Sequence, residues 1–183
     1  RKPRVSLKGV AYQLLLLAAI AVAVLLTGYF LRGAVLFLAL LAVTAASVYF
    51  INRMRSPFDI SPLFFATVAV TYFYGVKYAV LFVFLASIIP SLMAGSVIDL
   101  VSFSSLSFML LIAYFGIAVA GFGEKAGVLM SVAYGLAALG IIQLTTSDFG
   151  KAISTMAVLS VLNALYFLVL PGLVSQLGNA LVA

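Results

Sequence analysis

The sequence predicts an all-α integral membrane protein, a polytopic bundle of six or seven transmembrane helices. The first reason is composition: 66% of the 183 residues are hydrophobic and 8% are charged, against about 25% charged in an average soluble domain. The second is that the few charges divide the chain into apolar segments close to the roughly 20 residues that a helix needs to cross the hydrocarbon core. We therefore expect one integral membrane domain, residues 1–183, surrounded mainly by the lipid bilayer.

Seven apolar segments follow one another along the chain. They are Val10–Leu31, Ala34–Ile51, Ile60–Val76, Tyr78–Ile98, Leu100–Gly123, Ala126–Ser147 and Ala152–Val174. The second and third are short for a span, and either could be an incomplete helix that is buried against its neighbours. The sequence therefore fits seven spans, or six spans with one re-entrant or broken segment.

The basic residues predict the orientation. Arg1, Lys2, Arg4 and Lys8 lie in the N-terminal segment 1–9, before the first apolar run. With seven spans and a cytoplasmic N-terminus, seven of the ten Lys and Arg residues fall on the cytoplasmic side, as the positive-inside rule requires. We predict a multi-pass protein of the cell membrane whose cytoplasmic N-terminal segment meets anionic lipid headgroups. This clustering argues against nucleic-acid binding.

The stretch Pro57–Gly95 carries more helix breakers than a simple pair of spans needs. Pro62 opens its first apolar run, Gly75 ends that run, and Pro90 interrupts the second. A proline inside a helix removes a backbone hydrogen bond and clashes with the carbonyl one turn earlier. We therefore expect a proline- and glycine-broken helical hairpin in this stretch.

Composition also excludes several kinds of chemistry. The chain has no cysteine, no histidine and four acidic residues. Disulfides, thiolate nucleophiles, Ser-His-Asp triads and histidine proton relays are impossible, and a buried zinc or di-iron centre would have almost no ligands. The sequence contains no phosphate-binding glycine loop and no pair of catalytic carboxylates. We expect no enzymatic activity, no cofactor and no metal site.

The turn inside the broken hairpin offers candidate ligand-binding residues. Tyr74, Lys77 and Tyr78 surround Gly75. Their amphipathic rings suit the interfacial aromatic belt of a membrane protein. They would also suit the floor of an outward-facing pocket in which Lys77 anchors an anion. Both interpretations are open.

Polar residues gather where the fifth apolar segment begins. Asp99 is followed by Ser102, Ser104, Ser105 and Ser107. Asp99 is either an interfacial helix N-cap or a carboxylate that needs water, a cation or a partner. The serines either return hydrogen bonds to carbonyls of their own helix or line a wet cavity.

The last apolar segment places Asn163 near the expected centre of the bilayer. A buried amide costs free energy unless it is hydrogen-bonded. We therefore expect Asn163 to face the interior of the bundle and to have a partner, either another helix or a ligand. Tyr166, in the same helix, completes the set of candidate ligand-binding residues.

Small residues indicate where helices could approach one another closely. Ala19 and Ala23 form a small-xxx-small pair on one face of the first segment and are candidates for docking a partner helix. The alternative is that alanine is simply common in membrane helices. In the sixth segment, Gly135 and Gly140 would also permit close packing.

Three stretches resemble a known family. The run PFDISPLFFATVAVTYFYGVKYAVLFVFLASIIPSLMAG resembles the proline-led segment of the substrate-binding S-components of energy-coupling factor (ECF) vitamin transporters. The Ala19 and Ala23 pair resembles the alanine motif by which the first S-component helix docks on the transmembrane coupling subunit. The end, VLNALYFLVLPGLVSQL, resembles the Asn-bearing final helix of S-components and of the related MreD-like cell-shape proteins. The chain departs from the family in the additional segment Ala34–Ile51 and in lacking its G-P or acidic turns.

The resemblance implies a six-helix bundle that binds a vitamin or similar solute from outside, within a larger ATP-driven complex. The leading hypothesis is therefore a solute-binding component of a transporter, with an outward-open pocket and a transmembrane protein partner. The alternatives are a non-catalytic, MreD-like structural subunit of a larger membrane complex and a small channel.

Overall fold

The computed structural model describes residues 33–54, 59–146 and 149–182. These residues are almost all helical and include no strand, so the predicted all-helical fold is confirmed. Five helical segments are long and apolar enough to cross a membrane, judged by length and composition. They are the helix Gly33–Arg53, the continuous segment Val76–Met93, α5 (Leu100–Ala120), α6 (Glu124–Thr146) and α7 (Phe149–Val169).

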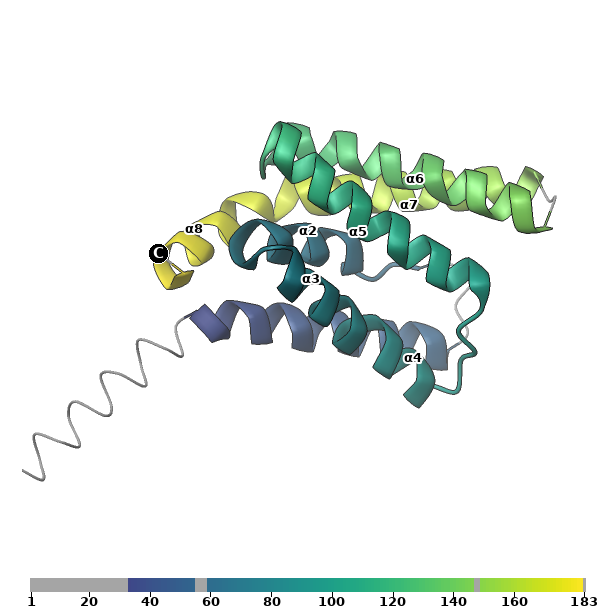
Figure 1. The fold of residues 1–183 in the computed structure, drawn as a ribbon, viewed down its shortest axis with the longest axis horizontal. Coiled ribbons are helices and arrows are strands. Elements are labelled where there is room, and N and C mark those ends of the chain that lie inside the picture. Colours follow the sequence, from purple (N-terminus) through teal and green to yellow (C-terminus); the bar gives the residue numbers. More distant parts are fainter. Residues whose placement is uncertain (1–32, 55–58, 147–148, 183) are drawn as a thin grey trace, which may run out of the picture.

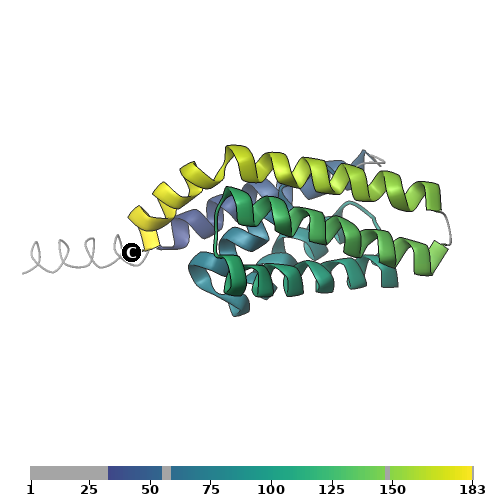
Figure 2. The same cartoon turned by 90° about the horizontal axis from the view of Figure 1, so that it is seen from above.

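The long helices run back and forth between two ends of an elongated bundle (Figures 1 and 2). One end contains Arg53, the turn at residues 94–99 and the beginning of α5, and we call it the Arg53 end. The opposite end contains Gly75 and the turn at residues 121–123 between α5 and α6, and we call it the Gly75 end. Ligand-binding candidates from the sequence therefore lie at both ends.

The shortest apolar helix, α2 (Leu63–Tyr74), lies at the centre of the bundle. Its 12 residues extend about 18 Å at 1.5 Å per residue, less than the roughly 30 Å of hydrocarbon. The non-helical residues 59–62 lead into it from the Arg53 end. Irregular backbone at membrane depth is tolerated where protein surrounds it.

The helix breakers foreseen in the sequence lie at or beside interruptions of the helices. Gly75, with a φ of 86°, separates α2 from α3 (Val76–Val83), and a positive φ is far less costly for glycine than for other residues. α3 continues through a π-helical turn, Phe84–Ile88, into α4 (Ile89–Met93). Pro90 lies two residues after this turn, as the second residue of α4, and its missing N–H removes the hydrogen bond that an α-helix would make there.

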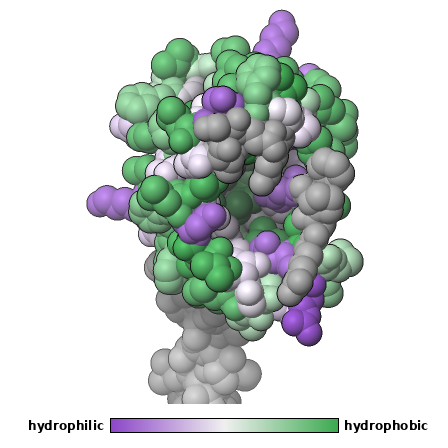
Figure 3. All heavy atoms as spheres, turned by 90° about the vertical axis from the view of Figure 1, so that its right-hand side faces the viewer, coloured by the Kyte–Doolittle hydropathy of each residue, from purple (hydrophilic) through white to green (hydrophobic). Residues whose placement is uncertain are grey.

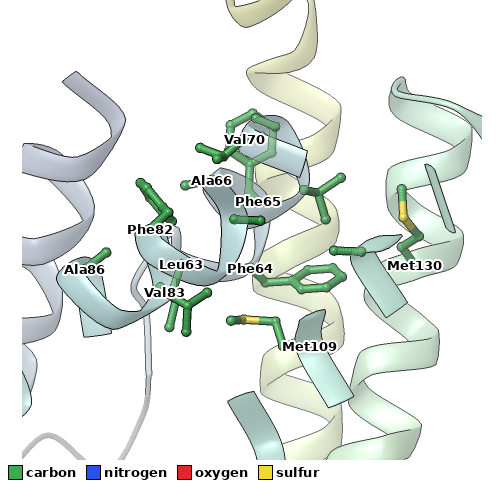
Figure 4. Close-up of a cluster of buried hydrophobic side chains, with 14 of the residues drawn as sticks. Leu63, Phe64, Phe65, Ala66, Val70, Phe82, Val83, Ala86, Met109 and Met130 are labelled. Carbon is green, nitrogen blue, oxygen red and sulfur yellow. The ribbon is translucent and has the colours of Figure 1, made fainter. Parts of the chain in front are cut away.

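The buried core is built around α2. Nine of its twelve residues are buried, and Phe82 of α3 and Met109 of α5 pack against it (Figure 4). The Phe65 ring meets the Phe167 ring of α7 edge-on, with 5.0 Å between centroids. A helix enclosed on all sides can be apolar nearly all round, which fits the absence of charged residues in α2. The hydroxyls of its buried threonines, Thr67 and Thr71, donate to carbonyls of the helix itself.

The outer surface of the bundle is also apolar. Val119 of α5 is 87% exposed and Leu144 of α6 is 88% exposed, and every long helix carries similar side chains. Exposing this much apolar surface to water would cost free energy, whereas lipid tails solvate it without cost. The surface therefore agrees with the bilayer expected from the sequence.

Close contact between α6 and α7 depends on glycine at two positions. A Cβ added at Gly127 would lie 1.9 Å from Cδ1 of Phe167, and one at Gly135 would lie 2.0 Å from Oγ of Ser160. At Gly140 an added Cβ would meet no atom within 4 Å. The expectation of close packing is therefore correct for Gly135 and wrong for Gly140, which lies on an open face of the same helix.

The final apolar segment, Ala152–Val174, is divided between two helices. α7 ends at Val169 and α8 (Pro171–Val182) begins two residues later, at an angle to α7 (Figure 2). Pro171 suits the first position of a helix, where its missing N–H costs nothing. α8 lies at the Gly75 end.

Candidate functional site

A polar cavity of about 300 Å³ lies at the Arg53 end. Figure 3 looks onto this end and shows hydrophilic side chains around a hollow with a hydrophobic floor. The lining comes from the helix Gly33–Arg53, the segment before α2, the first residue of α2, the π-helical turn, α4, α5 and α6. Its residues are Val48, Ile51, Asn52, Asp59, Leu63, Ser87, Ser91, Ser102, Ser105, Leu106 and Tyr134.

One wall of the cavity joins the helix Gly33–Arg53 to α4. Nδ2 of Asn52 donates a hydrogen bond of 3.0 Å to Oγ of Ser91. Ser87 lies four residues earlier, within the π-helical turn, and is buried. Both the Ser87 and the Ser91 side chains line the cavity. Pro90, which distorts this helical segment, thus lies between the two serines that the segment contributes to the cavity, Ser87 and Ser91.

The opposite wall joins α5 to α6. Oγ of Ser105 and the hydroxyl oxygen of Tyr134 are hydrogen-bonded at 3.0 Å. The Tyr134 ring is 7% exposed and stacks on Phe64 of α2, with centroids 4.7 Å apart and an interplanar angle of 12°. Core packing therefore fixes the hydroxyl of Tyr134 at the cavity.

Asp59 carries the only charge among the described residues that line the cavity. Its Oδ1 accepts a hydrogen bond of 2.9 Å from the backbone N–H of Ser61. This is the geometry of an Asx turn, which the Asp side chain stabilises locally. The turn orients the carboxylate and shapes the extended segment that leads into α2.

Asp99 is the N-cap of α5, so that interpretation of the sequence is confirmed. Its Oδ1 accepts 2.8 Å and 2.7 Å hydrogen bonds from the backbone N–H and the hydroxyl of Ser102. The cap satisfies a backbone N–H that has no partner within the helix. Asp99 therefore adjoins the cavity through Ser102 but is not part of its lining.

The serines of α5 divide between the two roles considered for them. Ser102 and Ser105 line the cavity, whereas the hydroxyl of Ser107 donates to the carbonyl of Phe103 in its own helix, at 2.9 Å. Their position around the helix decides the role, because only one face of α5 is turned toward the cavity.

Tyr74, Lys77 and Tyr78 lie at the Gly75 end, opposite the cavity. The Tyr74 hydroxyl donates to the carbonyl oxygen of Gly33, and the Tyr74 and Tyr78 ring centroids are 6.3 Å apart. Lys77 and Tyr78 are exposed. The structure therefore brings these three candidates together but separates them from Asp99 by the length of the bundle.

Asn163 faces the interior, as predicted, and is 3% exposed. Its Nδ2 donates a 2.8 Å hydrogen bond to the Leu159 carbonyl of the same helix, and its Oδ1 has no hydrogen-bond partner among the described residues. The Tyr166 hydroxyl donates at 2.6 Å to the carbonyl of Ile60, the residue after Asp59. Neither Asn163 nor Tyr166 lines the polar cavity. Ala19 and Ala23 lie outside the described residues.

Five polar lining residues were not among the candidate ligand-binding residues of the sequence. They are Asn52, Asp59, Ser87, Ser91 and Tyr134. The one available signal was the polar start of α5, which pointed correctly to Ser102 and Ser105. Comparison of the chain with family models, curated proteins and solved structures finds no match.

Proposed function

We propose that this protein is a membrane-embedded solute-binding component of a transport system. The observation that supports the proposal best is the polar cavity at the Arg53 end. Its volume of about 300 Å³ lies at the lower end of the roughly 300–1,000 Å³ of small-molecule sites. Seven polar side chains gather there inside an otherwise apolar bundle, where each polar group that loses water without gaining a partner costs free energy.

The construction of the walls favours binding over simple hydration. Asn52 and Ser91 are hydrogen-bonded to each other, as are Ser105 and Tyr134. These paired groups are held in place across four different helical segments, and preorganised polar groups bind a ligand at a lower entropic cost than mobile ones. Each pair retains lone pairs or hydrogens that a ligand could engage.

The direction in which the cavity opens depends on the first apolar segment. With a cytoplasmic N-terminus and seven spans, the Arg53 end faces the cytoplasm. If Val10–Leu31 does not cross the membrane, the same N-terminus leaves the cavity open to the outside, as the resemblance to S-components implies. In the second arrangement, the solute would be captured from outside. In the first, it would be released to the cytoplasm or taken from it.

The proposal is tested by a thermal-shift screen of the purified protein against water-soluble metabolites. We expect at least one metabolite to raise the melting temperature. Ser105→Ala and Tyr134→Phe should weaken that effect, because each removes one member of the hydroxyl pair in the wall.

Matched controls lie on α5. Ser107→Ala removes a hydroxyl that bonds within its own helix, and Tyr114→Phe alters an exposed ring; both should bind like the wild type. A screen without any stabilising metabolite would contradict the proposal and favour the structural-subunit alternative.

A further inference from the structure

The charge of the cavity lining is one-sided. Among the described lining residues, Asp59 is the only acid and there is no lysine or arginine. Arg53 adjoins the lining residue Asn52 but is exposed and not part of the lining. The other polar lining groups are neutral hydroxyls and one amide. Among these described groups, an anionic solute would therefore meet a carboxylate and no opposite charge.

Asp59 is positioned to meet a ligand. Its Oδ1 accepts a hydrogen bond from the backbone N–H of Ser61, and the residue is exposed rather than buried. The backbone on its C-terminal side is anchored, because the Tyr166 hydroxyl donates to the carbonyl of Ile60. The carboxylate is thus held at the cavity from two sides.

The neutral groups define the rest of the ligand. Two pairs of side chains on facing walls, Asn52 with Ser91 and Ser105 with Tyr134, are each hydrogen-bonded at 3.0 Å. All four side chains offer hydrogen-bond donors and acceptors. A volume of about 300 Å³ is far larger than a bare ion, and no group of three or more acidic, His or Cys side chains gathers within the described residues. The cavity therefore suits an organic molecule with several polar atoms.

Resting on the proposed function, we infer that the cavity selects organic cations: small solutes that carry an amine or quaternary ammonium group together with hydroxyl or amide groups. The cationic group pairs with Asp59, and the polar groups bond to the hydroxyls of α4, α5 and α6. A neutral solute that covered Asp59 would remove water from the carboxylate without replacing its charge interaction, which is costly. An anion would add repulsion.

The test compares three classes of solute on the full chain in detergent or nanodiscs, with dissociation constants measured by calorimetry. The cations are thiamine, choline and putrescine; the neutral solutes are nicotinamide, myo-inositol and 3,3-dimethylbutan-1-ol; the anions are pantothenate, biotin and citrate. The neutral alcohol has the shape of choline without its charge. We expect binding within the cationic class. Choline, where it binds, should exceed the alcohol by about tenfold or more, because its trimethylammonium group gains an ionic interaction with Asp59 that the alcohol lacks.

Variants assign the selectivity to Asp59. Asp59→Asn should weaken binding of the cation about tenfold or more, while Asp59→Glu retains the preference for cations. Glu124→Gln, at the first residue of α6 and the opposite end of the bundle, is the matched control and should bind like the wild type.

The outcomes separate this inference from the proposed function. Binding of neutral or anionic solutes in preference to cations, or unchanged cation binding by a folded Asp59→Asn, would overturn the inference and leave a solute-binding cavity. If Asp59→Asn does not fold, the class preference of the wild type and of Asp59→Glu still decides. If no solute of any class binds and the metabolite screen finds no stabilising compound, both this inference and the proposed function are overturned.

Discussion

Tyr166 ties the last long helix to the segment that carries Asp59. Its hydroxyl donates to the Ile60 carbonyl at 2.6 Å, and its ring lies beside Phe65, with centroids 6.5 Å apart. The residue was selected from the sequence as a ligand contact. In the structure its contacts instead support the backbone next to the cavity, which is a positioning role.

Tyr166→Phe should lower the stability by about 1 kcal/mol, the usual net value of one hydrogen bond. It should also weaken solute binding several-fold, because the segment that holds Asp59 loses an anchor. Thermal unfolding in detergent and a binding isotherm measure the two effects, with Tyr114→Phe as the control. An unchanged affinity together with a lower melting temperature would show that Tyr166 supports the fold alone.

Asp59 and Asp99 show why only part of the site could be predicted. The role of Asp99 follows from local spacing, since an Asp three residues before a helical backbone N–H is a typical N-cap, and the structure confirms it. The role of Asp59 depends on residues of five other helical segments that the fold brings around it. No periodicity in one sequence reveals that gathering.

At the scale of helices, the seam between α6 and α7 depends on small residues. Gly127, Ser131 and Gly135 recur every four residues, as in small-xxx-small packing. In the sequence, Gly135 and Gly140 are equally good candidates for close helix packing, because spacing alone does not say which face of a helix meets a neighbour.

Gly127→Ala should therefore destabilise the protein, because the new methyl group would overlap the buried ring of Phe167. Overpacking of this kind costs about 1–3 kcal/mol. Gly140→Ala, in the same helix, meets open space and should be neutral or slightly stabilising. Unfolding in a denaturing detergent measures the difference, and equal stability of the two variants would contradict the packing described for this seam.

The π-helical turn before Pro90 is the second feature at this scale. Pro90→Ala restores a backbone N–H and lets the turn relax toward a regular α-helix, which would rotate Ser87 relative to Ser91. We expect a folded protein with several-fold weaker solute binding.

Pro171→Ala is the control for that variant. Pro171 is also buried, but it lies at the first position of α8, where its missing N–H breaks no helical bond. Solute affinity should stay at the wild-type value. If Pro90→Ala also binds like the wild type, the distortion of the helix has no role in shaping the cavity.

At the scale of the whole molecule, the low charge and apolar segment lengths were enough to predict the helical fold. Among the described residues, the helix boundaries follow the predicted segments to within a few residues except at the last one, where Pro171 begins a separate helix. The first predicted segment, Val10–Leu31, lies outside the described residues. The location of the site was harder to predict. The sequence favours the aromatic turn at Gly75 as a binding site because the polar residues of that turn are close together in the chain. The polar cavity residues, in contrast, are dispersed from Asn52 to Tyr134.

The two ends of the bundle should face opposite sides of the membrane. The chain has no cysteine, so Arg53→Cys and Lys77→Cys each provide a single thiol for a membrane-impermeant maleimide. With seven spans, Lys77→Cys reacts from outside and Arg53→Cys only after permeabilisation; if Val10–Leu31 does not cross the membrane, the pattern reverses. Labelling of both from the same side would contradict a bundle that spans the membrane between these ends.

The most direct measurement is native mass spectrometry of the protein purified gently from the membranes in which it is made. Our expectation is that a small molecule is retained in the wild type and in Ser107→Ala, and that it is lost when Ser105→Ala and Tyr134→Phe are combined. A protein that carries no small molecule but retains a partner subunit, or one that holds its ligand equally well after both cavity hydroxyls are removed, would contradict it.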